Sequence, residues 1–126
     1  MKWLFGKGIL QIDNGVRIVL KNDICHYYRW LIAKNFPWIR TQIPKYKAHI
    51  TIYNPNIHGL KDTESIHYLQ DKEVTFYYNP EMMYRSSVNF WLPVRSEIYN
   101  EVKYFLNFKE TPNWWGLHLT VCNMKL

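Results

Sequence analysis

The sequence contains only two cysteines, Cys25 and Cys122, and neither belongs to a CxxC pair. This scarcity excludes a disulfide framework and the usual spacing of a zinc site, and it favours a reducing compartment. No stretch approaches the roughly 20 apolar residues that cross a bilayer. Lys7 interrupts the apolar N-terminus too early for a signal peptide. We therefore expect a cytoplasmic protein that does not bind membranes.

Short metal-binding patterns are missing as well, because the sequence has no HxH, HxxxH or DxD. We therefore expect no metal ion and no other cofactor. Runs of five or more Lys or Arg are also absent, which excludes an RNA-coating tail. Acidic residues are scarce, since 10 Asp and Glu stand against 16 Lys and Arg. The net charge of +6 favours an anionic partner such as a nucleotide or RNA.

The composition indicates a single folded domain over residues 1–126. Hydrophobic residues make up 48% of the chain, which permits a packed core, and 126 residues leave no room for two domains. Aromatic residues make up 17%, so some remain for a binding surface after the core is filled. Nothing in the composition calls for an obligate protein partner.

Alternating patterns and turn residues predict the same order of elements twice: strand, strand, helix, strand. The predicted elements are strands over 2–12 and 16–21, a helix over 24–36, strands over 46–53, 73–78 and 83–92, a helix after Ser96, and a strand over 116–124. Asn14-Gly15 predicts a hairpin turn between the first two strands. The chain is therefore expected to be a duplicated unit, with lobes of roughly 1–71 and 72–126.

Each unit ends in one motif: His, aliphatic, Thr, aliphatic, any residue, Asn. The two copies are His49-Ile50-Thr51-Ile52-Tyr53-Asn54 and His118-Leu119-Thr120-Val121-Cys122-Asn123. A single His-x-Thr triplet is weak evidence for a site, but two copies in the same register of a repeat are strong.

The motif suits chemistry at phosphorus. Side chains of a strand alternate between faces, so His49 and Thr51 share one face, as do His118 and Thr120. An ordinary imidazole has a pKa of about 6.5, so near pH 7 one histidine of a pair can act as base and the other as acid. The two Thr hydroxyls can donate to the phosphate oxygens.

These residues resemble the 2H phosphoesterase superfamily, also called LigT-like, which is defined by two H-x-S/T-x motifs with aliphatic neighbours. The resemblance implies a bilobal α+β fold with pseudo-two-fold symmetry, in which two antiparallel sheets flank a central cleft and helices lie outside. It also implies that His49 and His118 are catalytic, that Thr51 and Thr120 bind phosphate, and that no metal takes part.

Members of that family act on 2′,3′-cyclic phosphate RNA ends, on 2′-5′ linked oligonucleotides, on ADP-ribose cyclic phosphate, or on cyclic nucleotide immune signals. A compact chain rich in Lys, Asn, Ile and Tyr favours a phage or viral member, similar to anti-CBASS enzymes or 2′-5′ oligoadenylate phosphodiesterases. We therefore expect a metal-independent phosphodiesterase that degrades a nucleotide immune signal, in the host cytoplasm if the protein is viral. RNA-end processing and non-catalytic nucleotide sequestration are the alternatives.

Five further side chains are candidates for substrate binding. Tyr53 is expected on the face of His49 to stack on a base, and Trp115 precedes the second motif. Arg85 and Trp91 are expected on one face of a single strand, as a phosphate ligand and a base-stacking ring. Lys47 is expected to raise the electrostatic potential beside the first motif.

Overall fold

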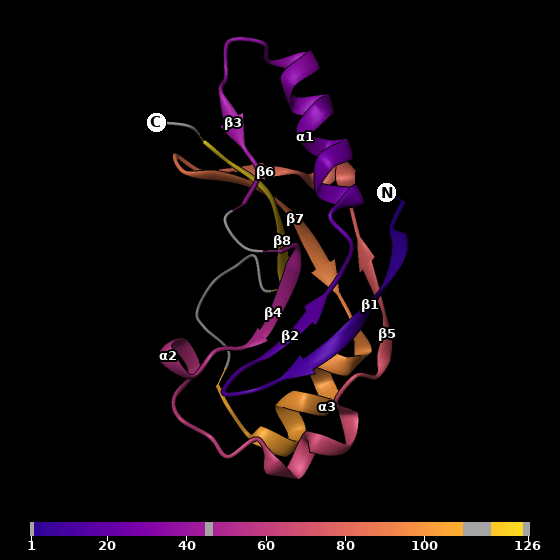
Figure 1. Cartoon of the computed structure of the whole chain (residues 1–126), viewed down its shortest axis with the longest axis vertical. Helices are drawn as coiled ribbons and strands as arrows, with labels where there is room; N and C mark the ends of the chain where they lie inside the picture. Colours follow the sequence, from indigo (N-terminus) through magenta and orange to yellow (C-terminus); the bar gives the residue numbers. More distant parts are fainter. Residues whose placement is uncertain (1, 45–46, 110–116, 125–126) are drawn as a thin grey trace.

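The computed structural model describes residues 2–44, 47–109 and 117–124, which form an α+β fold around one antiparallel sheet (Figure 1). The strand order is β3-β8-β4-β2-β1-β5-β7-β6. These strands are β1 (Leu4–Ile12), β2 (Val16–Val19), β3 (Thr41–Gln42), β4 (His49–Tyr53), β5 (Glu73–Tyr78), β6 (Tyr84–Arg85), β7 (Asn89–Arg95) and β8 (His118–Met124).

A further pairing between β7 and β8 closes six of the strands into a barrel: β8, β4, β2, β1, β5 and β7. The predicted α+β class is confirmed. The predicted pair of separate sheets is not found in the described part of the chain, because pairing of β4 and β7 with β8 joins the two halves into one sheet. Closure also leaves no free edge on these six strands.

The helices lie outside the barrel. They are α1 (Asp23–Asn35), α2 (Pro55–His58) and α3 (Glu97–Leu106), together with two 3₁₀ helices, η1 (Glu64–Leu69) and η2 (Pro80–Met82). In Figure 1, α1 and α3 lie at opposite ends of the molecule, where α1 packs on β8 and α3 on β4 and β5. Within the described residues, none of these helices has the length and apolar character that spanning a bilayer requires.

Apart from the two-residue strands β3 and β6 and the short helices, the predicted element order repeats, with β1, β2, α1 and β4 in the first half and β5, β7, α3 and β8 in the second. Equivalent strands of the two halves are hydrogen-bonded neighbours in the sheet, β1 with β5 and β4 with β8. The pairings therefore repeat as well, because β2 lies between β1 and β4 as β7 lies between β5 and β8, and the two motif strands β4 and β8 are neighbours.

The first hairpin shows why Gly15 is needed at its turn. The Gly15 N–H donates to Asp13 Oδ1 at 2.9 Å, and the Asp13 N–H donates to the Gly15 carbonyl oxygen at 3.0 Å. A Cβ at Gly15 would lie 2.8 Å from the carbonyl oxygen of Tyr53, too close for any other residue without a shift. This turn holds β2 in place beside β4.

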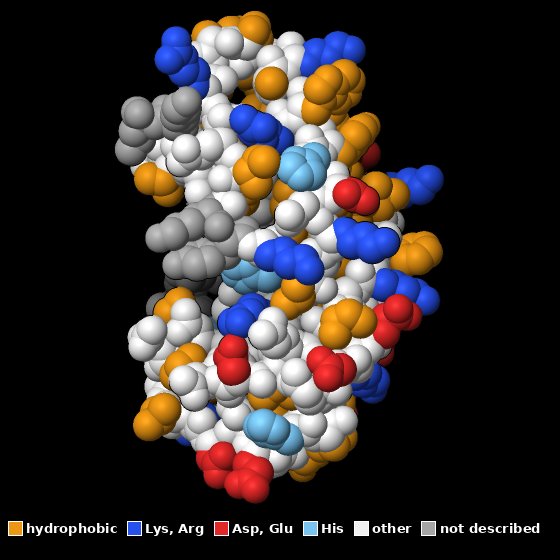
Figure 2. All heavy atoms as spheres, in the orientation of Figure 1, with side chains coloured by type: hydrophobic (Ala, Val, Ile, Leu, Met, Phe, Trp, Pro, Cys, Tyr) orange, Lys and Arg blue, Asp and Glu red, His pale blue; other side chains and the backbone are white. Residues whose placement is uncertain are grey.

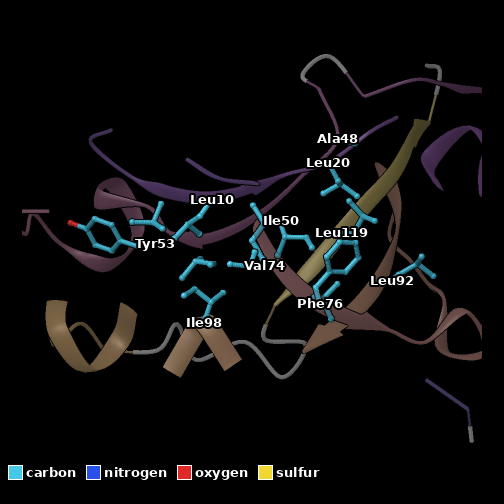
Figure 3. Close-up of a cluster of buried hydrophobic side chains, with 14 of the residues drawn as sticks. Leu10, Leu20, Ala48, Ile50, Tyr53, Val74, Phe76, Leu92, Ile98 and Leu119 are labelled. Carbon is cyan, nitrogen blue, oxygen red and sulfur yellow. The ribbon is translucent and has the colours of Figure 1, made fainter. Parts of the chain in front are cut away.

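Alternation along the strands directs aliphatic side chains into the core (Figure 3). Leu10, Ile18, Ile50, Leu92 and Leu119 have no exposed surface. Burial of such side chains stabilises the fold by about 1.5–3 kcal/mol each. Because Ile50 and Leu119 point into the core, their neighbours in the two motifs point to the outer face of the sheet.

Candidate active site

The two motifs lie side by side on adjacent antiparallel strands. Ile50 of β4 pairs with Leu119 of β8. Continuing this register by one residue in each direction places His49 across from Thr120, and Thr51 across from His118. The two histidines are then diagonal neighbours on the two strands, with Cα atoms about 7–8 Å apart, so both rings can reach one small ligand.

One small cavity of about 50 Å³ collects both motifs. Its lining consists of Pro44, Lys47, Ala48, His49, Thr51, His118 and Thr120. The structure thus brings together the four side chains that the sequence assigns to catalysis. Neither Thr51 nor Thr120 donates its hydroxyl to a described residue, so both hydroxyls can turn toward a ligand in this cavity.

Each motif contains a β-bulge at the same position, directly after its His-x-Thr triplet. Between the pairs Arg17↔Thr51 and Val16↔Tyr53, β4 contains one extra residue, Ile52. Between the pairs Trp91↔Thr120 and Phe90↔Cys122, β8 contains one extra residue, Val121. A bulge shifts the alternation of a strand by one residue.

The bulges turn the fifth residue of each motif inward. Tyr53 and Cys122 are buried next to the bulged residues Ile52 and Val121, so two successive side chains on each strand enter the core. The His and Thr residues before each bulge stay half-exposed on the outer face. The two halves therefore share both the motif residues and the bulged backbone that orients their side chains.

The orientation of the His49 ring is set by its own strand. Nδ1 of His49 lies 2.8 Å from the carbonyl oxygen of Lys47. A carbonyl oxygen can only accept, so Nδ1 carries a proton and donates it. In the neutral ring, Nε2 then holds the lone pair and is the atom available to exchange a proton with a ligand.

An aromatic wall stands beside His118. Trp91 contacts the His118 ring edge-on, with ring centroids 5.6 Å apart, and stacks on Tyr84 at 4.5 Å. Trp91 therefore lies next to the site, as the sequence suggested, but its ring is only 8% exposed. It acts as a wall for His118 more than as an open stacking surface. No sequence pattern predicts that Tyr84 lies at the site, because only the β6–β7 pairing places it against Trp91.

The expectation that Tyr53 stacks on a base is wrong. Its side chain is 1% exposed, and the bulge at Ile52 turns it away from the face of His49. The Tyr53 hydroxyl donates to the Gly59 carbonyl oxygen at 2.5 Å and accepts from the Lys61 N–H at 2.8 Å. Tyr53 therefore anchors the loop after α2.

The expectation that Arg85 and Trp91 share one face of a single strand is also wrong. The predicted strand over 83–92 is a hairpin, in which β6 turns back onto β7 and Arg85 pairs with Phe90. The Arg85 guanidinium lies over the Phe90 ring at 5.8 Å, on the face opposite to Trp91 and the motifs. Trp115 lies outside the described residues.

Cations line the face that carries the first motif. Lys47 is exposed and borders the motif cavity, as expected, and Arg17 pairs directly with Thr51. Both side chains also line a larger hollow of about 590 Å³ that includes His49 and Thr51. Figure 2 shows blue Lys and Arg side chains beside a pale blue histidine near the middle of the molecule. Such a surface attracts an anion.

Helix α1 supports the second motif from the core side. The Cys25 thiol donates to the carbonyl oxygen of Thr120 at 3.5 Å. Burial, with a smaller contribution from Cys122, raises the pKa of the Cys25 thiol to about 11. Burial also raises the pKa of Cys122. Both thiols are therefore protonated near neutral pH and serve in packing.

Among the side chains that the structure describes, no three His, Cys, Asp or Glu residues converge as a metal-binding group. Comparisons of the chain with protein-family models, with curated proteins and with solved structures found no match.

Proposed function

We propose that this protein is a phosphodiesterase of the 2H type, which cleaves cyclic or 2′-5′ linked oligonucleotides without a metal ion. The observation that carries the proposal is the meeting of His49, Thr51, His118 and Thr120 in one cavity. Two further observations support it: the matched bulges that orient both motifs, and the cations on the adjoining face.

The reaction needs a base on the attacking oxygen and an acid on the leaving oxygen. One imidazole takes the proton of a water or a ribose hydroxyl as that oxygen bonds to phosphorus. The other imidazole gives a proton to the oxygen that leaves. For His49 the exchanging atom is Nε2, because Nδ1 donates to Lys47. Each such proton transfer typically contributes about 10²–10⁴ in rate.

Charge that develops on the phosphate oxygens is met by hydrogen-bond donors on both sides. The hydroxyls of Thr51 and Thr120 come from opposite strands and can donate to the two non-bridging oxygens. Because β4 and β8 are paired, each side of the phosphate would meet one imidazole and one hydroxyl.

The charge and size of the adjoining hollow support a nucleotide as the substrate. A hollow of about 590 Å³ next to the motif cavity accommodates a nucleotide, and Arg17 and Lys47 favour one with several negative charges. We propose a nucleotide immune signal as the substrate and the cytoplasm as the place of action.

The test is a chromatographic turnover assay in the presence of EDTA. Substrates are 3′,3′-cyclic GMP-AMP, a cyclic trinucleotide, 2′-5′ oligoadenylate and RNA with a 2′,3′-cyclic phosphate end. Cleavage of a signalling nucleotide that is lost in His49→Ala and in His118→Ala supports the proposal. Cleavage of the RNA end alone assigns the protein to RNA processing, and tight binding with no cleavage assigns it to sequestration. Activity that EDTA abolishes contradicts the metal-free mechanism.

A further inference from the structure

The residues across from the two threonines break the symmetry of the site. Thr51 pairs with Arg17 of β2, whereas Thr120 pairs with Trp91 of β7. Directly paired residues share a face, with Cβ atoms about 4.5–5.5 Å apart. A cation therefore flanks the first motif and an aromatic ring flanks the second. The two sides of the site offer different chemistry to a substrate.

The side of the site with Arg17 is open. The hollow lined by Arg17 continues from the motif cavity, since Lys47, His49 and Thr51 border both. Gln11 pairs with Arg17 on the next strand and lines the same hollow. In the described part of the chain, the side chains of Gln11 and Lys47 make no hydrogen bond or ion pair. These groups are available to a ligand that extends over β2 and β1.

Arg17 is held by an exposed ion pair that a phosphate can displace. Its Nη2 atom lies 3.0 Å from Asp13 Oδ2, and the two side chains are 37% and 50% exposed. Exposed ion pairs of this kind contribute little to stability. A guanidinium can bind phosphate through two parallel hydrogen bonds, which are stronger than a contact to a solvated carboxylate.

We propose that Arg17, together with Lys47, forms a second phosphate subsite next to the two histidines. The subsite makes the enzyme prefer linear oligonucleotides with a further phosphate on the β2 side of the scissile bond. This inference rests on the proposed function. It orients the substrate on a site whose histidines alone do not distinguish one direction from the other.

The experiment compares an adenylate dimer, whose one phosphate is the scissile linkage, with the corresponding trimer. Both 2′-5′ and 3′-5′ linkages are tested. The variants are Arg17→Gln, Asp13→Asn and, as a matched loss of charge outside the site, Lys34→Gln. Lys34 lies on α1 over the Trp30 ring and lines none of these cavities. Asp13→Asn keeps an oxygen acceptor for the Gly15 N–H in the turn.

A charge-assisted contact to the second phosphate predicts that wild-type kcat/KM is about tenfold or more higher for trimer than for dimer. Arg17→Gln should bring that ratio close to one, Asp13→Asn should raise kcat/KM for the trimer, and Lys34→Gln should leave both unchanged. A ratio that Arg17→Gln leaves unchanged overturns the subsite while leaving the phosphodiesterase intact.

If wild-type protein cleaves neither length, binding decides the subsite, and the proposed function is judged separately by the assay with cyclic substrates. Fluorescence anisotropy with a labelled trimer then compares wild type, Arg17→Gln and Lys34→Gln. Weaker binding by Arg17→Gln alone supports the phosphate subsite, and equal binding by all three overturns it.

Discussion

Ile52 and Val121 occupy equivalent places in the two halves of the molecule, each as the extra residue of a bulge directly after a His-x-Thr motif. Both side chains are buried, with exposures of 1% and 0%. The bulge ends the outward face of each strand at the threonine. The motif geometry thus depends on core packing one residue away from the chemistry.

Truncation of these bulge residues is therefore expected to lower stability. Ile52→Ala should lower the free energy of unfolding by about 2–5 kcal/mol, because it leaves a cavity in the core. Val121→Ala should cost less, since it removes fewer carbon atoms. Urea denaturation followed by circular dichroism measures both. Val88→Ala, at an exposed position, is the control and should change little. If Val88→Ala lowered the free energy of unfolding as much as Ile52→Ala, the structural role of the bulges would be contradicted.

The two histidines should act as a unit. His49→Ala and His118→Ala are each expected to lower kcat by about 10²–10⁴, and the double variant should lose much less than the product of the two losses. Single-turnover kinetics on purified variants measures these effects. His26→Ala and His67→Ala remove exposed imidazoles outside the cavity and should retain full activity. Wild-type turnover by either motif variant would exclude the two-histidine mechanism.

The threonine hydroxyls should contribute to the transition state more than to substrate binding. Thr51→Val and Thr120→Val are each expected to reduce kcat by about 10²–10³ with a smaller effect on KM, as for loss of one oxyanion donor. Thr→Ser at each position keeps the hydroxyl and should restore most of the rate. If the valine and serine variants were equally slow, side-chain shape and not the hydroxyl would explain the loss.

Tyr53 should affect stability and not substrate recognition. Tyr53→Phe keeps the buried ring but removes the hydroxyl that bonds to the Gly59 carbonyl and the Lys61 N–H. The expected cost is about 1–3 kcal/mol in the free energy of unfolding, because two part-buried hydrogen bonds are lost at about 0.5–1.5 kcal/mol each. KM at a temperature where the variant is folded should equal that of wild type. A raised KM in the fully folded variant would indicate that Tyr53 contributes to substrate binding.

Cys25 should make the protein less stable in alkali. Its folded-state pKa of about 11 lies above the ordinary value of 9.0, so the unfolded chain loses the thiol proton first. The stability that this thiol contributes is complete below pH 9 and is lost as the pH rises toward 11. Urea unfolding from pH 8 to 10.5 should therefore show a shallower decline for Cys25→Ala than for wild type. Equal slopes would show that the buried thiol does not titrate differently on folding.

The repeat and the paired motifs could be predicted because both are local properties of the sequence. Asn14-Gly15 marks the first hairpin, and the alternation around Ile50 and Leu119 identifies the strands that carry the histidines. The α+β class follows from the same patterns. Closure of the barrel could not be predicted, because pairing between β7 and β8 depends on contacts that no local pattern reports.

Three errors or omissions at the site have particular physical causes. Tyr53 was assigned to the wrong face because one inserted residue, Ile52, shifts a period of two without changing composition. Arg85 was placed on a continuous strand because the β6–β7 turn contains no Gly or Pro and is held by the Ser86 hydroxyl. The sequence does not identify Arg17 as a site residue, because its position across from Thr51 depends on the register of β2 and β4.

The β4–β8 pairing links the proposed activity to folding, because the site is complete only when these two strands are paired. Each half of the chain supplies one imidazole and one hydroxyl, and neither half contains a complete site. The two strands meet only when distant parts of the sequence come together, and such contacts form slowly. Under the proposed function, activity would therefore report closure of the barrel, and a chain that has folded only one half would be inactive.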